Sequence, residues 1–152
     1  MDILVELQNL KDNRLLRDDQ EVEKFEKAIE DILTMKDGNH IALLCQGFDD
    51  DTENDEVMFG LIHAIESYDN IVGSVSSLSI LANSFSVMLP HAQEWLKIIQ
   101  KRILNHDPSR ETYKKIIPTL DSDIQKVIIS QLNAIKAKNA SRFEQSVNSV
   151  LS

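Results

Sequence analysis

Apolar side chains recur every three or four residues along almost the whole of this chain. In the segment 18–35, for example, Val22, Phe25 and Ile29 fall at this spacing. The period places apolar side chains on one face of a helix. Only 4 glycines and 3 prolines occur in 152 residues, which is too few turn-forming residues for a β-sandwich or barrel. The pattern predicts an all-α fold without strands.

Capping residues, glycines and prolines mark where the helices should begin and end. We expect helix starts at Asp18-Asp19, Thr52, Asp107-Pro108-Ser109 and Asp121 or Ser122. Asp37-Gly38-Asn39 should end the second helix, and Pro90 should lie in the first turn of another. The result is about eight or nine helices, near residues 2–16, 18–35, 40–48, 52–68, 71–85, 90–105, 107–117, 121–135 and 141–151.

The connections between these helices are short, which favours antiparallel neighbours. We therefore predict one domain over residues 1–152, built as a HEAT-like stack of helical hairpins. No sequence period of roughly 30–45 residues is visible, so the likeness to repeat proteins concerns the arrangement alone. The stretch Met58–Ile65 is apolar on most faces and should be buried at the centre, and Trp95 should lie in the core.

Charge is distributed unevenly along the chain. Residues 1–76 hold 19 acidic and 6 basic residues, a net charge of −13, whereas residues 77–152 hold 6 acidic and 10 basic residues, a net charge of +4. An acidic surface repels nucleic acid and anionic lipid and attracts cationic proteins. We therefore expect a binding protein with a basic protein partner, and no nucleic-acid or membrane partner. We expect the basic residues of the second half to form an ordinary solvated face. They could equally pair with the acidic half of another copy of the chain.

An acidic run is the candidate binding site, because six of the eight residues from Asp49 to Glu56 are acidic. A calcium loop that began at Asp49 would need Gly at position six and Glu at position twelve, where this chain has Asn54 and Gly60. Two interpretations stay open: a solvated loop before a helix, and a protein-docking patch. Under the second, the docking residues are Asp49, Asp50, Asp51, Glu53, Asp55 and Glu56.

Other chemistry finds little support in the sequence. Glu56, His63 and Glu66 could line one helix face, and we expect a semi-buried polar network with Arg102 as counter-charge, without a metal. Cys45 is the only cysteine and should be a buried, inert thiol. No nucleophile elbow, HExxH, CxxC or glycine-rich phosphate loop occurs. We therefore expect no enzyme activity, no catalytic residues and no cofactor.

The expected location is the cytoplasm. The N-terminus lacks a basic segment followed by an apolar one, which a secretory signal would require. The longest apolar run is also far shorter than the ~20 residues that a membrane span needs.

Several stretches resemble a known family. They are Phe48–Asp50, Glu56–Glu66, Ala92–Trp95 and Arg102–Asn105. Together they are similar to the immunity protein 30 family of bacterial polymorphic toxin and contact-dependent inhibition systems, over roughly residues 40–115. The first forty and last thirty-five residues add nothing to this likeness.

The resemblance implies an all-helical cytosolic protein that binds and neutralises a cognate toxin, often a nuclease. The positions that match the family pattern are expected to support the fold: Glu56, His63, Glu66, Trp95, Arg102 and Asn105. The resemblance does not indicate which residues touch the toxin, so the docking surface is argued from charge. The alternative function is a helical adaptor that binds another basic protein without any toxin.

Overall fold

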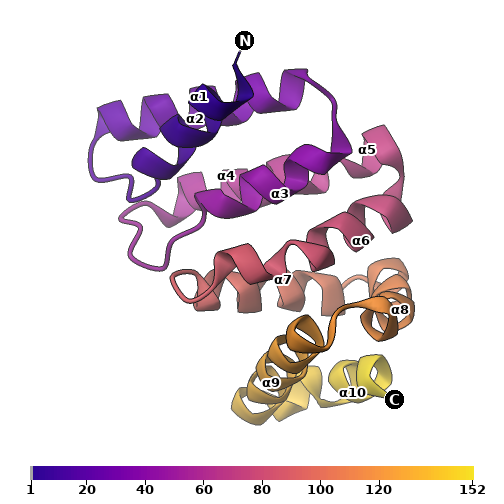
Figure 1. The fold of residues 1–152 in the computed structure, drawn as a ribbon. Helices are drawn as coiled ribbons and strands as arrows, with labels where there is room; N and C mark the ends of the chain where they lie inside the picture. Colours follow the sequence, from indigo (N-terminus) through magenta and orange to yellow (C-terminus); the bar gives the residue numbers. More distant parts are fainter. Residues whose placement is uncertain (1) are drawn as a thin grey trace. The chain divides into compact units, whose positions relative to one another are not determined.

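The computed structural model describes residues 2–152, and this part of the chain is all-helical, as the sequence predicts (Figure 1). It contains ten α-helices and four short 3-10 helices. The α-helices are α1 (Ile3–Asp12), α2 (Asp19–Thr34), α3 (Ile41–Leu44), α4 (Asp55–Glu66), α5 (Asp69–Val72), α6 (Ser74–Asn83), α7 (Gln93–Leu104), α8 (Asp107–Ile116), α9 (Ser122–Lys138) and α10 (Ala140–Leu151). The 3-10 helices are η1 (Gly38–His40), η2 (Cys45–Gly47), η3 (Phe85–Met88) and η4 (Ile117–Thr119).

The helices group into two compact units, one ending at Gln93 and the other beginning at Glu94. In the first unit, α1 and α2 form a hairpin, α2 packs on α4, and α3 packs on α6 (Figure 1). In the second unit, α9 and α10 form a hairpin and α10 also packs on α8. Helical hairpins therefore occur in both units. The single domain expected over residues 1–152 stays a prediction. No helix among residues 2–152 is both long and apolar enough to cross a membrane.

The first unit buries one side of α4. Met58 and Leu61 are fully buried, and Ile62, Ala64 and Ile65 are nearly so, which confirms the core position expected for this stretch. The opposite face of α4 is open, because Gly60 and His63 are exposed.

Two helix ends in the first unit differ from the prediction. The residue in the left-handed conformation after α2 is Lys36, with φ 51°, and not Gly38. Gly38 instead allows close packing, because a Cβ atom there would lie 2.9 Å from the Val72 side chain. The segment expected as one helix over residues 71–85 is divided into α5 and α6 at Gly73, whose φ of 88° interrupts the helix.

The starts of two other helices also differ from the prediction. Helix α7 begins at Gln93, so Pro90 precedes it and does not lie in its first turn. The cap of α8 is His106, whose Nδ1 accepts a hydrogen bond from the Ser109 backbone at 3.3 Å. By contrast, Asp18 caps α2 and Asp121 precedes α9, as predicted.

The second unit has a core that contains polar side chains. Trp95 is 4% exposed, as expected of a core residue. Further along α7, the amide of Gln100 donates to Gln131 Oε1 at 2.6 Å and its oxygen accepts from the Tyr113 hydroxyl at 2.9 Å. These three buried side chains come from α7, α9 and α8 and connect the helices through hydrogen bonds.

Candidate functional site

The acidic run forms a loop and the start of a helix. Residues 49–53 connect the end of η2, through Phe48, to the cap of α4, while Asp55 and Glu56 lie in the first turn of α4. Acidic residues at a helix start interact favourably with the helix dipole. Below, the acidic loop means residues 49–56.

Asn54 caps α4, and not Thr52 as the sequence predicted. The extended backbone of Asn54 (φ −140°, ψ 90°) allows its Oδ1 to accept a hydrogen bond from the Val57 N–H at 3.1 Å. The Thr52 hydroxyl instead accepts a long hydrogen bond of 3.5 Å from the Asn54 N–H, inside the loop. The helix therefore starts later, which leaves four of the six acids outside it.

Asp49 differs from the other acids because it is only 9% exposed. Its carboxylate lies 3.2 Å from Arg14 Nε and accepts a hydrogen bond from the Asp51 N–H at 2.9 Å. The same guanidinium donates to the Gln46 carbonyl at 3.0 Å. Arg14 thus fixes both sides of the loop's first turn, and the Asp49 carboxylate is engaged within the fold.

Backbone hydrogen bonds fix the rest of the loop. The Asp50 N–H donates to the His91 carbonyl at 2.8 Å, and the Glu53 N–H donates to the Leu15 carbonyl at 2.8 Å. These partners belong to two separate connections of the first unit, one between α1 and α2 and one before α7. The loop is therefore held to its neighbours at both ends.

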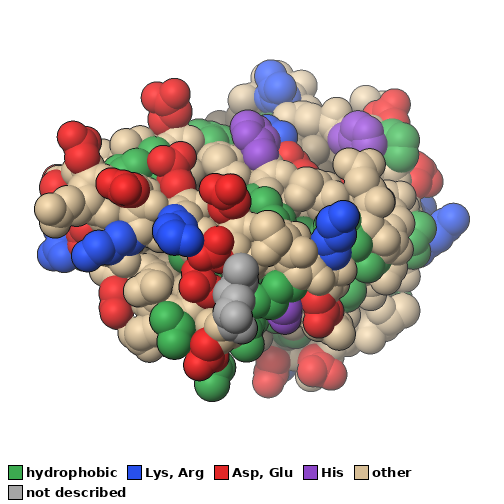
Figure 2. Space-filling model, turned by 90° about the horizontal axis from the view of Figure 1, so that it is seen from above, with side chains coloured by type: hydrophobic (Ala, Val, Ile, Leu, Met, Phe, Trp, Pro, Cys, Tyr) green, Lys and Arg blue, Asp and Glu red, His purple; other side chains and the backbone are tan. Residues whose placement is uncertain are grey.

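The remaining carboxylates of the acidic loop face solvent. The exposed residues are Asp50, Asp51, Glu53, Asp55 and Glu56. A second set of exposed acids, Glu23, Glu26 and Glu30, follows a single stripe of α2. Figure 2, seen from the side of α1 and α2, shows many Asp and Glu side chains on this face, with fewer Lys and Arg between them. The exposed acids of the loop and of α2 are both candidates for contact with a cationic surface.

His91 does not add positive charge beside the loop at neutral pH. Partial burial lowers the pKa of its imidazole, and the nearby Arg14 guanidinium lowers the pKa further, against the raising effect of Asp49 and Asp50. The neutral imidazole is therefore favoured.

The network predicted on α4 was expected to be half-buried, and this prediction is wrong. Glu56, His63, Glu66 and Arg102 are all exposed. Nowhere among residues 2–152 do three His, Cys, Asp or Glu side chains group in a way that could hold a metal ion. Of the positions that match the family pattern, only Trp95 lies in the core, since Asn105 is exposed too.

Cys45 is fully buried, as predicted. Burial raises the pKa of its thiol to about 12, so the reactive thiolate is scarce at neutral pH.

Sequence reasoning missed the residues that hold the acidic loop. Arg14, Leu15 and His91 lie 35 or more residues along the chain from their partners in the acidic loop. Leu15 and His91 act through backbone carbonyls, which every residue has, so no side-chain signal exists for them. The burial of Asp49 had one signal in the sequence, which is its position directly after Phe48, at the end of an apolar stretch.

The comparison with known families gives one match. The family model of Immunity protein 30 matches residues 12–113, more than half of the chain. The match therefore begins earlier than the resemblance over residues 40–115 suggested, and it includes α2, the acidic loop, α4 and α7. Helices α9 and α10 lie beyond it. No curated protein and no solved structure matches significantly. The chain belongs to the immunity protein 30 family.

Proposed function

We propose that this protein neutralises a cognate bacterial toxin domain by binding it stoichiometrically, with the exposed carboxylates of the acidic loop in the contact. One observation supports this docking site: five solvent-exposed acids lie on a loop that is hydrogen-bonded at both ends. Family membership supports the immunity role. The residues proposed to touch the toxin are Asp50, Asp51, Glu53, Asp55 and Glu56.

The partner proposed here is a basic nuclease domain. Nucleases hold phosphates and therefore carry positively charged clefts. An acidic loop can occupy such a cleft and exclude RNA or DNA without any chemistry of its own, so no enzymatic activity is required. In this proposal the protein acts in the cytoplasm, where an incoming nuclease meets its substrate.

The fixed backbone of the loop favours this role for two physical reasons. A loop that is already ordered loses little conformational entropy when it binds. Closely spaced carboxylates also repel one another, and a cationic partner relieves that repulsion. Asp49 contributes indirectly, because its contact with Arg14 holds the turn from which Asp50 and Asp51 project.

Two experiments test the proposal. The first is co-expression of the chain with a toxin domain encoded next to it, scored by survival of the cells. The second measures association of the two purified proteins by stopped-flow fluorescence at low and high salt. The test variant is Asp50→Lys/Asp51→Lys/Glu53→Lys, and the matched control is Glu23→Lys/Glu26→Lys/Glu30→Lys, which changes the net charge equally on α2.

We expect reversal of the loop acids to slow association at low salt by about tenfold or more and to flatten its dependence on salt. The α2 variant should have a smaller effect, because both variants alter long-range steering but only one alters the contact. Wild-type association by the loop variant, with slow association by the α2 variant, would move the docking site to α2. Cell death despite co-expression of soluble protein would contradict the immunity function toward that toxin.

A further inference from the structure

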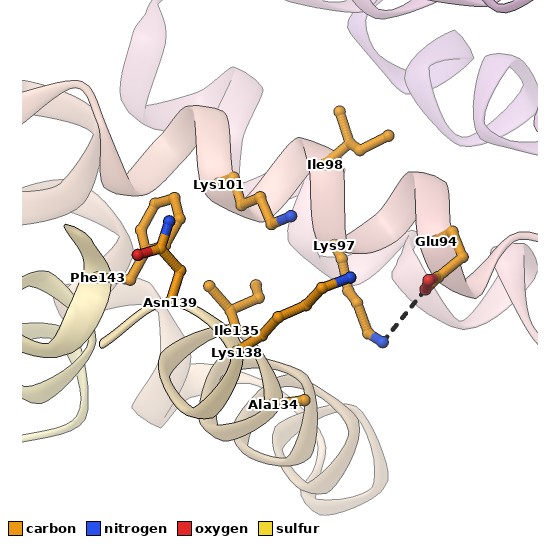
Figure 3. A pocket seen from close by; sticks show the side chains of 9 residues that line it. All are labelled: Glu94, Lys97, Ile98, Lys101, Ala134, Ile135, Lys138, Asn139 and Phe143. Carbon is orange, nitrogen blue, oxygen red and sulfur yellow. Dashed lines mark ion pairs between the residues drawn. The ribbon is translucent and has the colours of Figure 1, made fainter. Parts of the chain in front are cut away.

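The second unit contains a basic cleft of about 370 Å³. Its lysines are Lys97 and Lys101 of α7 and Lys138 at the end of α9. Ile98, Ile135 and Phe143 are among the residues that line it (Figure 3). In Figure 3 the side chains of Lys101 and Lys138 extend into the space between α7 and α9.

One lysine of the cleft, Lys97, is paired with an acid, and in the described part of the chain the other two are not. Glu94 lies 3.2 Å from Lys97 and, among the residues that the structure describes, is the only acid that lines the cleft. Within residues 2–152, Lys101 and Lys138 have no carboxylate partner within ion-pair distance. Two cations without a carboxylate partner, Lys101 and Lys138, beside an apolar lining favour an occupant that carries apolar side chains with carboxylates close by.

One segment of this chain has that chemistry. On α1, Leu4 is 69% exposed and Val5 is 53% exposed, and the exposed acids Asp2 and Asp12 stand at the two ends of the helix. Leu4 is the most exposed large hydrophobic side chain among the described residues. Leu4, Gln8 and Asp12 follow each other at intervals of four, so they share one side of the helix.

Other exposed groups fit the cleft less well. The acidic loop has many carboxylates, but between Asp49 and Glu56 it contains no apolar residue to fill the cleft. Ile71 and Val75 are exposed, but the only acid directly beside them is Asp69, because the segment 70–93 that holds both has no charged residue. Ile129 is exposed on α9, in the unit that is itself basic. Among residues 2–152, α1 is the helix that carries exposed large apolar side chains between an exposed acid at each end.

We propose that the exposed side of α1 in one copy of this protein docks in the basic cleft of a second copy. Leu4 and Val5 would cover the apolar lining, and Asp2 and Asp12 would face the lysines. The contact joins two different surfaces, so two copies can exchange it reciprocally or a series of copies can continue it. It does not use the exposed carboxylates of the acidic loop, and it requires no toxin.

The test is sedimentation of the full chain by analytical ultracentrifugation over a range of protein concentrations at low and high salt. The wild-type protein should self-associate at low salt, and high salt should weaken the association. Lys101→Glu/Lys138→Glu should raise the dissociation constant about tenfold or more. The matched control Lys114→Glu/Lys126→Glu changes the same charge at exposed sites outside the cleft and should have a smaller effect.

A charge swap identifies the two surfaces. Asp2→Lys/Asp12→Lys should also self-associate weakly, but an equimolar mixture with Lys101→Glu/Lys138→Glu should associate again, because each reversed surface then meets a complementary one. Asp2 caps α1 through the Leu4 N–H at 2.9 Å, so Leu4→Ser, which keeps the cap, provides a second test of the same surface. Circular dichroism of each variant confirms that the helices persist.

Two results would overturn the proposal. One is a wild-type protein that sediments as a monomer at every concentration in low salt. The other is self-association that survives both Lys101→Glu/Lys138→Glu and Leu4→Ser. Loss of association with Val75→Ser together with survival in those variants would assign the contact to α6 instead.

Discussion

The unit that ends at Gln93 and the unit that begins at Glu94 differ most in charge. The first holds 19 acidic and 6 basic residues, and the second holds 6 acidic and 10 basic residues. Because the segment 70–93 has no charged residue at all, the change of sign coincides with the boundary between the units. The polarity seen in the sequence is therefore a property of two separate packing units, and each can offer its own surface to a partner.

The units also use buried polar groups differently. In the first unit the acidic loop is fixed from its edge, by the Arg14–Asp49 pair and by backbone hydrogen bonds. In the second unit the polar groups lie inside the core, where Gln100 links Gln131 and Tyr113. A polar chain inside a core restricts how the helices can pack, whereas a pair at the edge positions a surface loop. Four predictions test this difference.

Loss of a large core side chain should have the largest effect. Trp95→Ala in the second unit and Phe25→Ala in the first should each lower the free energy of unfolding by about 3–5 kcal/mol, because each leaves a cavity. Urea unfolding followed by circular dichroism measures this loss. Ile129→Ala, at a side chain 40% exposed, is the control and should cost less than about 1 kcal/mol. An unchanged midpoint for Trp95→Ala would place this residue outside the core.

Gln100→Leu should be the next most severe change and is specific to the second unit. It removes the hydrogen bonds that Gln100 makes to the Tyr113 hydroxyl and to the Gln131 amide oxygen, at a cost of about 2–4 kcal/mol in total. Tyr113→Phe removes only one hydroxyl and should cost about 1 kcal/mol. The urea transition of Trp95 fluorescence measures both. If Gln100→Leu were as stable as the wild type, the hydrogen bonds among Gln100, Gln131 and Tyr113 would contribute nothing to the stability of this core.

Arg14→Leu should have a smaller effect on stability and a clear effect on the acidic loop. The substitution leaves the Asp49 carboxylate nearly buried without its cation, which should cost about 1–3 kcal/mol, less than a fully buried pair because Arg14 is partly exposed. Amide hydrogen exchange of residues 49–53 should also accelerate. Arg17→Leu removes the exposed pair with Glu21 and should leave both measurements unchanged. Equal exchange in the two variants would show that backbone hydrogen bonds alone order the loop.

Alkylation of Cys45 should show the smallest change under native conditions. The only cysteine lies in the first unit and the only tryptophan in the second, so each unit has its own probe. Because burial raises the pKa of the Cys45 thiol to about 12, iodoacetamide at pH 8 should modify the native protein very slowly and the urea-unfolded chain readily. Mass spectrometry over time measures the rate. Equal rates in the native and unfolded protein would contradict the buried position.

Helices and core residues could be predicted from the sequence because they depend on local periodicity. Phe143, Val147 and Val150 are buried at the spacing that the sequence showed, and Asp18 caps its helix because the chain there is free to become extended. The cap predicted at Thr52 and the first-turn position predicted for Pro90 were wrong, because the position of a helix start depends on which backbone groups are already bonded to other segments. Asn54 caps α4 after the Glu53 N–H has bonded to Leu15.

The sequence by itself determined that this protein is all-helical and acidic in its first half, since both follow from residue types and their spacing. Only the tertiary structure decided which acids are available. Asp49 and Asp50 are neighbours of the same sign, yet Asp49 is nearly buried beside Arg14 and Asp50 is exposed. The basic cleft, likewise, brings Lys101 and Lys138 together from helices that are distant in the chain. Packing between residues that are distant in the chain sets these environments, and a local sequence pattern carries no information about such contacts.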